Sequence, residues 1–313
     1  MTVSPARHHS PAEAGAGIVV STESAGLGNR LKSWVSAMRL SPRALVVWPV
    51  TPNMPARFSD LFANDCEVDA VPEAASVYSS WRLAVLPEDE THLPPGFATA
   101  GAGAHPLIRA IGKAWWKLRG CPDDRYRYML FPKTHSSRTT RADARHIDFE
   151  YGRIPQPIRD AYVPLFARIA VRPEIVARLD AWAADVGIDA RTVGVQIRTW
   201  RDDSRRHAKY HRAAFGRLLR LMEREPEPTR FLAVADDDGV LKALVERFGA
   251  ARVLTFPRRT PRAESWASPA GIAEDLTDML LLARTRRMFV SYLSTFGEAA
   301  WWLGGANAEI TVF

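Results

Sequence analysis

Residues 192–199 read Thr192-Val193-Gly194-Val195-Gln196-Ile197-Arg198-Thr199 and predict a buried β-strand whose apolar run ends at an arginine. Because successive side chains of a strand point to opposite faces, Gln196 and Arg198 share the face opposite Val195 and Ile197. A guanidinium at the end of a buried strand lies at an edge of the sheet, and its fork of donors suits bidentate binding of phosphate. The strand therefore predicts an anion site at Arg198.

Outward from this strand, the C-terminal half alternates between helices and strands. Two helices precede the strand, at 157–170 and 173–186. After it we expect helices at 209–224, 239–248, 272–283 and 295–303, and strands at 231–235, 252–256 and 288–291. This alternation is typical of a doubly wound α/β unit built on a parallel sheet.

The N-terminal half begins with a second α/β pattern. A strand is expected at 18–22, a helix at 28–40 and a strand at 44–48, with an apolar helical stripe of Leu31, Trp34, Val35 and Met38. Residues 51–150 are less regular, with a further strand expected at 126–131. We therefore expect two Rossmann-like doubly wound α/β domains in tandem, facing across a cleft. Its expected parts are a disordered leader at 1–16, an N-terminal domain at 17–170 and a C-terminal domain at 171–313.

The composition is that of a globular protein. Of 313 residues, 47% are hydrophobic and 25% charged. No apolar run approaches the roughly 20 residues that a membrane span needs, and the leader has no apolar core of a signal peptide. Two cysteines, Cys66 and Cys121, are too few for a disulfide framework, so each is expected in the core. We expect a cytoplasmic protein without a membrane span.

The net charge of +7 raises the alternative of a basic nucleic-acid-binding protein. Arginine greatly outnumbers lysine, which a GC-rich genome produces without selection for binding. The basic clusters at 201–206 and 258–262 favour an anionic ligand. Because no nucleic-acid module is recognisable, we do not expect a nucleic-acid partner.

A glycine-containing turn, Gly26-Leu27-Gly28-Asn29-Arg30, stands between the first strand and the first helix. Glycines let a backbone approach a ligand closely, and a helix N-terminus attracts anions. Asn29 and Arg30 add side chains that can hydrogen-bond a phosphate. The spacing is not the dinucleotide fingerprint, and a purely structural turn is the alternative.

Acidic and imidazole side chains follow the strand ends. Asp237 or Asp238 is expected to cap the next helix, whereas Asp236 is a candidate for ligand contact, with an Asp-x-Asp metal site as the weaker alternative. Asp202 is a general-base candidate, against the alternative of a solvated loop. His207 and His211 have a spacing that metal ligands use, but no third ligand is apparent, so cap-region histidines are favoured.

The segment 291–298 closes the last predicted strand and opens a helix. Ser294 or Thr295 suits the N-cap, and Glu298 follows Thr295 by three residues, as in a capping box. Hydroxyls and free amides at a helix start also form an anion site. Asp278 lies within an apolar helical run and needs a partner there, unless it sits on the polar edge of that helix.

These motifs together resemble the GDP-fucose-dependent fucosyltransferase superfamily, which includes the nodulation fucosyltransferase, the α1,6-fucosyltransferases and the protein O-fucosyltransferases. The similarity runs in order from residue 17 to residue 305. Its pieces are Gly26-Leu27-Gly28-Asn29-Arg30, Phe58-Ser59-Asp60-Leu61-Phe62, Val193–Arg198, Ala235-Asp236-Asp237, Asp278-Met279-Leu280-Leu281-Leu282 and Ser294-Thr295-Phe296-Gly297.

The resemblance implies a GT-B-type fold and a metal-independent, inverting transfer. It implies that Arg198 binds the diphosphate and stabilises the departing GDP. Asp278 would help to hold the guanine, with Gln196 as a second contact to the base. The resemblance also implies that the turn with Ser294, Thr295 and Phe296 lies at the phosphates. The turn with Gly26, Gly28, Asn29 and Arg30 would face the cleft from the N-terminal domain.

The chain departs from the family at three positions. Gln196 replaces the usual histidine two residues before the arginine, and Gly297 replaces the serine after the phenylalanine. The acidic residue that normally follows the arginine is displaced, which leaves Asp202 as the nearest carboxylate. A different nucleotide sugar is therefore an open alternative.

From these residues we expect a metal-independent inverting glycosyltransferase that transfers fucose from GDP-fucose to a bacterial glycan. Its expected partners are a nucleotide sugar and a glycan acceptor, with no metal or other cofactor. The alternatives are another nucleotide- or phosphosugar-handling enzyme of Rossmann-like fold and the nucleic-acid-binding protein.

Overall fold

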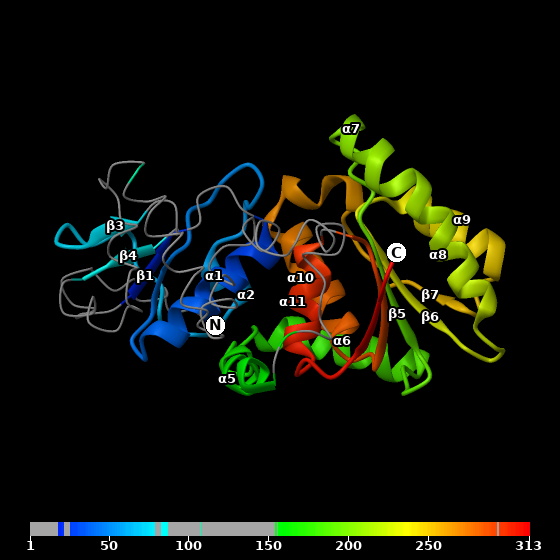
Figure 1. Ribbon diagram of the computed structural model, residues 1–313, viewed down its shortest axis with the longest axis horizontal. Coiled ribbons are helices and arrows are strands. Elements are labelled where there is room, and N and C mark those ends of the chain that lie inside the picture. Colours follow the sequence, from blue (N-terminus) through cyan, green and yellow to red (C-terminus); the bar gives the residue numbers. More distant parts are fainter. Residues whose placement is uncertain are drawn as a thin grey trace, which may run out of the picture.

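The computed structural model describes residues 18–21, 26–78, 83–86, 107, 154 and 156–313 except 293. Two β-sheets lie on opposite sides of a layer of helices (Figure 1). This mixed α/β architecture is the fold class that the sequence predicts. The leader at 1–16, the strand at 126–131 and Cys121 lie outside the described residues.

The C-terminal half contains a five-stranded sheet that is parallel throughout, with strand order β7-β6-β5-β8-β9. The predicted strands at 192–199, 231–235, 252–256 and 288–291 are present. The fifth strand was not predicted. The bounds are β5 (Val193–Ile197), β6 (Phe231–Ala235), β7 (Val253–Leu254), β8 (Arg287–Val290) and β9 (Glu309–Val312).

Helices cover both faces of this sheet (Figure 1). Val193, Val195 and Ile197 pack with α8 (Arg212–Arg224) and α9 (Asp238–Phe248). The opposite face is covered by α6 (Pro173–Val186), α10 (Pro269–Leu282) and α11 (Thr295–Leu303). The alternation along β5 therefore turns Gln196 to the face opposite Val195 and Ile197, as the sequence predicts, and that face lies toward α11.

The helix predicted at 209–224 has an irregular start. A short α7 (Ser204–Arg206) and the π-helical segment η8 (His207–His211) precede α8. A 3₁₀ helix, η9 (Arg262–Ala267), lies between β7 and α10. Neither η8 nor η9 has a periodic apolar signal in the sequence, which explains why they were not predicted.

The N-terminal half confirms the predicted βαβ unit. Strand β1 (Ile18–Ser21) leads through α1 (Leu27–Leu40) to β2 (Leu45–Val47), and the two strands are parallel. Two further strands, β3 (Ser76–Tyr78) and β4 (Leu83–Val85), were not predicted, and both join by antiparallel pairing. The described part of this sheet is therefore mixed, in the order β2-β1-β4-β3.

One hydrophobic core joins the two halves. It includes Trp34 and Trp48, which pack edge-on against Phe58 of α2 (Phe58–Leu61), and it continues into Met279 and Trp302 of the C-terminal half. Helix α5 (Gln156–Phe166) contacts both α1 and α11. The domain boundary between 170 and 171 remains a prediction, since this core extends across it.

Two further sequence predictions concern Cys66 and membrane spans. Cys66 is half-buried against the core, and burial raises the pKa of its thiol to about 12. No helix in the described part of the chain combines the length and the apolar character needed to cross a bilayer.

Candidate functional site

Most of the predicted site residues gather at the carboxyl edge of the five-stranded sheet. The chain leaves β5, β6 and β7 on one side and then returns through β8 and β9 on the other, so the strand order reverses between β5 and β8. Ligands of open α/β sheets bind at such a switch point. Arg198 follows β5 directly and Ser291 follows β8, and the Arg198 backbone N–H donates to Ser291 Oγ at 2.8 Å. Arg198 therefore stands at the switch point.

Carboxylates and indole rings surround the Arg198 guanidinium. Nη1 lies 2.5 Å from Asp236 Oδ2, and Nη2 lies 3.5 Å from Asp202 Oδ2. The guanidinium carbon is 5.1 Å from the Trp200 ring and 5.8 Å from the Trp266 ring. About a quarter of the side chain remains exposed. The charge is thus held in one place and stays accessible from outside.

Gln196 is buried, with 3% of its surface exposed, and turns its amide toward the first turn of α11. A Cβ added to Gly297 would lie 3.3 Å from Gln196 Oε1. Within the described part of the chain, that oxygen has no hydrogen-bond partner. A buried amide oxygen without a partner is costly unless a donor reaches it, so this position suits a ligand group.

The first turn of α1 packs directly on the first turn of α11. A Cβ on Gly28 would lie 2.6 Å from the Thr295 carbonyl oxygen, whereas one on Gly26 would meet no described atom within 4 Å. The Asn29 Oδ1 atom is buried and unpartnered among the described residues. Two helix N-termini, Gly26–Asn29 and Ser294–Gly297, therefore meet beside Gln196, and their amides favour an anion.

Arg30 is fully buried, and its guanidinium is directed into the N-terminal half. Nη1 donates to the Pro49 carbonyl at 2.9 Å, and the guanidinium carbon lies 4.8 Å from the Trp48 ring. These contacts give Arg30 a packing role. Its contact with a ligand stays a prediction.

Ser294 is the N-cap of α11, and its hydroxyl accepts from Gly297 N at 3.3 Å. The expected capping box between Thr295 and Glu298 is not formed. Glu298 instead binds Lys32 of α1, with Nζ 2.6 Å from Oε2 and both side chains buried. Thr295 and Phe296 are half-buried at this junction.

The three aspartates after β6 have separate partners. Asp237 caps α9 by accepting from Gly239 N, as the sequence predicts for Asp237 or Asp238. Asp238 binds Arg262 through both the backbone N–H and Nη1, each at 2.9 Å. Asp236 accepts from Arg198 and from the Thr199 N–H at 2.8 Å, so it positions the arginine.

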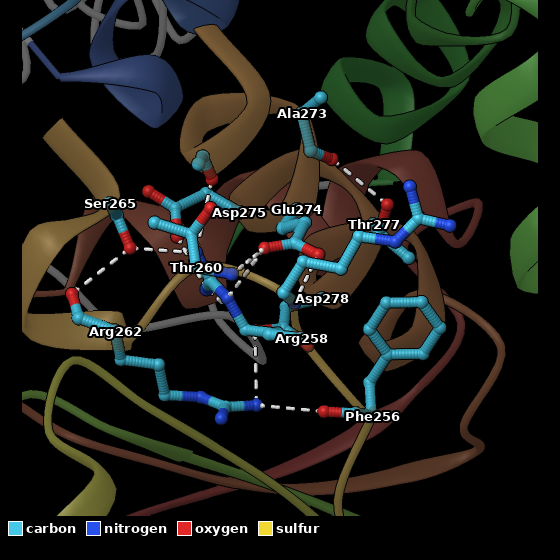
Figure 2. Close-up of polar contacts among 12 residues, drawn as sticks. Phe256, Arg258, Thr260, Arg262, Ser265, Ala273, Glu274, Asp275, Thr277 and Asp278 are labelled. Carbon is cyan, nitrogen blue, oxygen red and sulfur yellow. Dashed lines mark hydrogen bonds and ion pairs between the residues drawn. The ribbon is translucent and has the colours of Figure 1, made fainter. Parts of the chain in front are cut away.

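Asp278 lies inside a network of buried charges (Figure 2). Arg258 Nη1 is 3.1 Å and Arg262 Nη2 is 3.5 Å from Asp278 Oδ2. Burial raises the pKa of Asp278 to about 6, although both guanidinium groups oppose this shift. The predicted need for a partner is thus met by two arginines. A contact between Asp278 and a nucleobase remains a prediction, with 1% of the residue exposed.

His207 and His211 lie next to the loop that carries Arg198. His207 Nδ1 is 2.7 Å from the Thr199 carbonyl, which can only accept, so Nδ1 donates. The two rings are 4.9 Å apart. Burial and the neighbouring His207 lower the pKa of His211. Among the described residues, no group of three or more His, Cys, Asp or Glu is arranged to hold a metal ion.

Sequence reasoning missed two members of this site, Trp200 and Trp266. Trp200 has a left-handed φ of 55°, an uncommon conformation for a bulky residue that tends to mark functional loops. Trp266 stands on η9, which had no sequence signal as a helix, together with Arg262 of the basic cluster at 258–262. The position of Trp200, two residues after Arg198, was the one available clue.

The fold and this geometry define an α/β protein with a candidate anion site at its switch point. No protein-family model matches the chain, and no curated protein shows significant similarity. Solved structures do: NodZ α-1,6-fucosyltransferase soaked with GDP-fucose is 21% identical, with 91% of each chain covered and a TM-score of 0.47. A NodZ structure from Bradyrhizobium is also 21% identical, with 90% of each chain covered and a TM-score of 0.47.

FUT1 from Arabidopsis thaliana, in complex with GDP, is 14% identical over 94% of this chain and 69% of that one, with a TM-score of 0.49. These are similarities to the superfamily that the sequence motifs resemble.

Proposed function

We propose that the chain is a glycosyltransferase that transfers fucose from GDP-fucose to a glycan acceptor, by an inverting and metal-independent reaction. The observation that carries the proposal is the position of Arg198. It stands at the switch point of a parallel sheet, next to the meeting point of two helix N-termini and the buried amide of Gln196. The Arg198 guanidinium and the helix amides are donors that suit a diphosphate, whereas the Gln196 oxygen suits a donor group of the same ligand.

In the proposed reaction, the acceptor hydroxyl attacks the anomeric carbon from the face opposite the diphosphate. The bond between that carbon and the diphosphate oxygen breaks, and its electron pair leaves with GDP. Arg198 offsets the negative charge that develops on the leaving group, which lowers the barrier. Asp236 and the Ser291 hydroxyl hold Arg198 in place for this role.

The hydroxyl proton must pass to a base, and Asp202 is the candidate. Its carboxylate lies 3.5 Å from Arg198 Nη2, and about half of the side chain is exposed. A carboxylate in this position reaches solvent and an incoming acceptor while it stays next to the leaving-group site. Its assignment as the base follows from position alone.

Calorimetric titration with GDP, in the presence of EDTA, tests the binding half of the proposal on wild type, Arg198→Ala and Arg198→Lys. Loss of charge-assisted hydrogen bonds should weaken GDP binding by about 10- to 100-fold in Arg198→Ala, with partial retention in Arg198→Lys. Arg191→Ala is the matched control, because Arg191 is an exposed arginine that precedes the opposite end of β5.

Release of GDP from GDP-fucose tests the catalytic half. Turnover by Arg198→Ala equal to wild type would exclude the assigned role. Salt-dependent retention of DNA or RNA, with no binding of GDP, would instead favour a nucleic-acid-binding protein.

A further inference from the structure

Trp266 is an unusual surface residue. Three large apolar side chains are exposed in the described part of the chain, namely Val50, Leu107 and Trp266, and Trp266 is the one aromatic among them, at 38% exposure. Single exposed apolar side chains are common on protein surfaces, so the exposure of Trp266 alone does not indicate a binding site. Its support and its neighbours make it informative.

The short helix η9 that carries Trp266 is braced by buried charges (Figure 2). Arg262 is paired with Asp238 and Asp278, and the Ser265 hydroxyl accepts from Arg258 Nη2 at 2.7 Å. A Cβ on Gly271 would lie 2.3 Å from the Ser265 carbonyl oxygen, so α10 packs against the η9 backbone. The indole is therefore presented on a rigid support.

Trp266 also adjoins the anion site. Its ring is 5.8 Å from the guanidinium carbon of Arg198, and Arg201 Nη2 donates to the Ala263 carbonyl within η9. Arg201 and Arg198 both contact Asp202, at 3.8 Å and 3.5 Å. An occupant of the indole face thus lies beside two arginines and one carboxylate, which favours an anionic ligand with a flat ring over a neutral saccharide.

We propose that Trp266 is the stacking platform for the nucleobase of the bound nucleoside diphosphate, with a purine as the preferred base. This inference rests on the proposed function, because it assumes that Arg198 binds the diphosphate. A ligand with phosphate at Arg198 carries its base within reach of the neighbouring indole, and aromatic side chains bind bases through their π faces. The larger ring of a purine covers more of the indole than a pyrimidine does.

Calorimetric titrations of wild type, Trp266→Ala, Trp266→Phe and Arg198→Ala with GDP, UDP and inorganic pyrophosphate test the proposal. Loss of stacking should weaken GDP binding by about 10-fold or more in Trp266→Ala, and UDP binding less. Pyrophosphate has no base, so its affinity should change less than about 2-fold. Trp266→Phe should retain most of the GDP affinity, which also guards against misfolding of the alanine variant.

Glu264→Ala is the matched control, since Glu264 is an exposed residue of the same helix. Its ratio of GDP to pyrophosphate affinity should equal that of wild type. Unchanged affinity of Trp266→Ala for both GDP and pyrophosphate, with both ligands lost in Arg198→Ala, would overturn the stacking role and leave the proposed function intact. Equal weakening of GDP and pyrophosphate binding in Trp266→Ala would overturn the stacking role too, because Trp266 would then act only through Arg198. Absence of GDP and pyrophosphate binding to wild type would overturn both proposals.

Discussion

Arg198 is fixed from three strands at once. Its backbone N–H donates to Ser291 after β8, and its guanidinium binds Asp236 after β6, while its own backbone continues β5. A cation held in this way needs little reorganisation when charge develops on a leaving group. The Asp236 carboxylate also offsets part of the arginine charge. A bound diphosphate therefore interacts with an arginine that is already in an ion pair.

Asp278 should make the stability of the protein depend on pH between about 4 and 6. Burial raises its pKa from 3.8 to about 6, so the native state binds the proton more tightly than the unfolded state does. The stability that this protonation provides is complete below the unfolded pKa and is lost as pH rises through the native one. Relative to Asp278→Asn, wild type should lose up to about 3 kcal/mol of unfolding free energy over this interval.

Urea unfolding of both proteins at several pH values measures that difference. Asp180→Asn is the control, because Asp180 is an exposed carboxylate paired with Arg284 on the surface. The control should follow wild type closely. A constant difference between wild type and Asp278→Asn from pH 4 to 7 would show that the two arginines keep Asp278 ionised throughout.

At the scale of elements, the contact between α1 and α11 depends on Gly28. A Cβ there would lie 2.6 Å from the Thr295 carbonyl oxygen, and backbone cannot move aside as a flexible side chain does. Gly28→Ala should therefore destabilise the protein by about 1–3 kcal/mol. It should also weaken GDP binding, since the two helix N-termini would separate. Chemical denaturation and calorimetry measure the two effects.

Gly216→Ala on α8 is the matched control for this change. Among the described atoms its Cβ would meet Arg220 Nη1 alone, at an ordinary 3.7 Å, and alanine is the better helix former. We expect a gain of about 0.5–1 kcal/mol and no change in GDP binding. Equal stability of Gly28→Ala and wild type would show that the α1–α11 contact adjusts freely.

Most elements of the C-terminal half were predictable because buried parallel strands are continuous apolar runs. The runs at 231–235 and 295–303 matched β6 and α11 to the residue. The missed elements lack such a signal: β9 is a half-exposed strand of four residues, and η8 and η9 are held by specific contacts. The sequence placed Arg198 and Asp236 each at the end of a strand. It did not indicate that the two side chains form an ion pair, because that depends on β5 and β6 being neighbours in the sheet.

At the scale of the whole molecule, the two halves share one core, and the site stands where they meet. Helix α1 of the N-terminal half lies against α11 of the C-terminal half (Figure 1), and the apolar cluster continues from Trp34 to Trp302. The sequence indicated two α/β halves, because each has its own alternation. It did not indicate how closely they join, because side chains far apart in the chain make that contact.

The buried pair of Lys32 and Glu298 links these halves over 266 positions of sequence, at 2.6 Å. Removing one partner leaves a buried charge without compensation, so Lys32→Met and Glu298→Leu should each cost about 3–5 kcal/mol of unfolding free energy. The double variant should recover most of that loss, because two apolar side chains can pack where the pair stood. Urea unfolding followed by fluorescence and by circular dichroism measures all four proteins, and in wild type both probes should report a single transition. Losses that add in the double variant would mean that the two residues act independently, and two separate wild-type transitions would mean that the halves fold without each other.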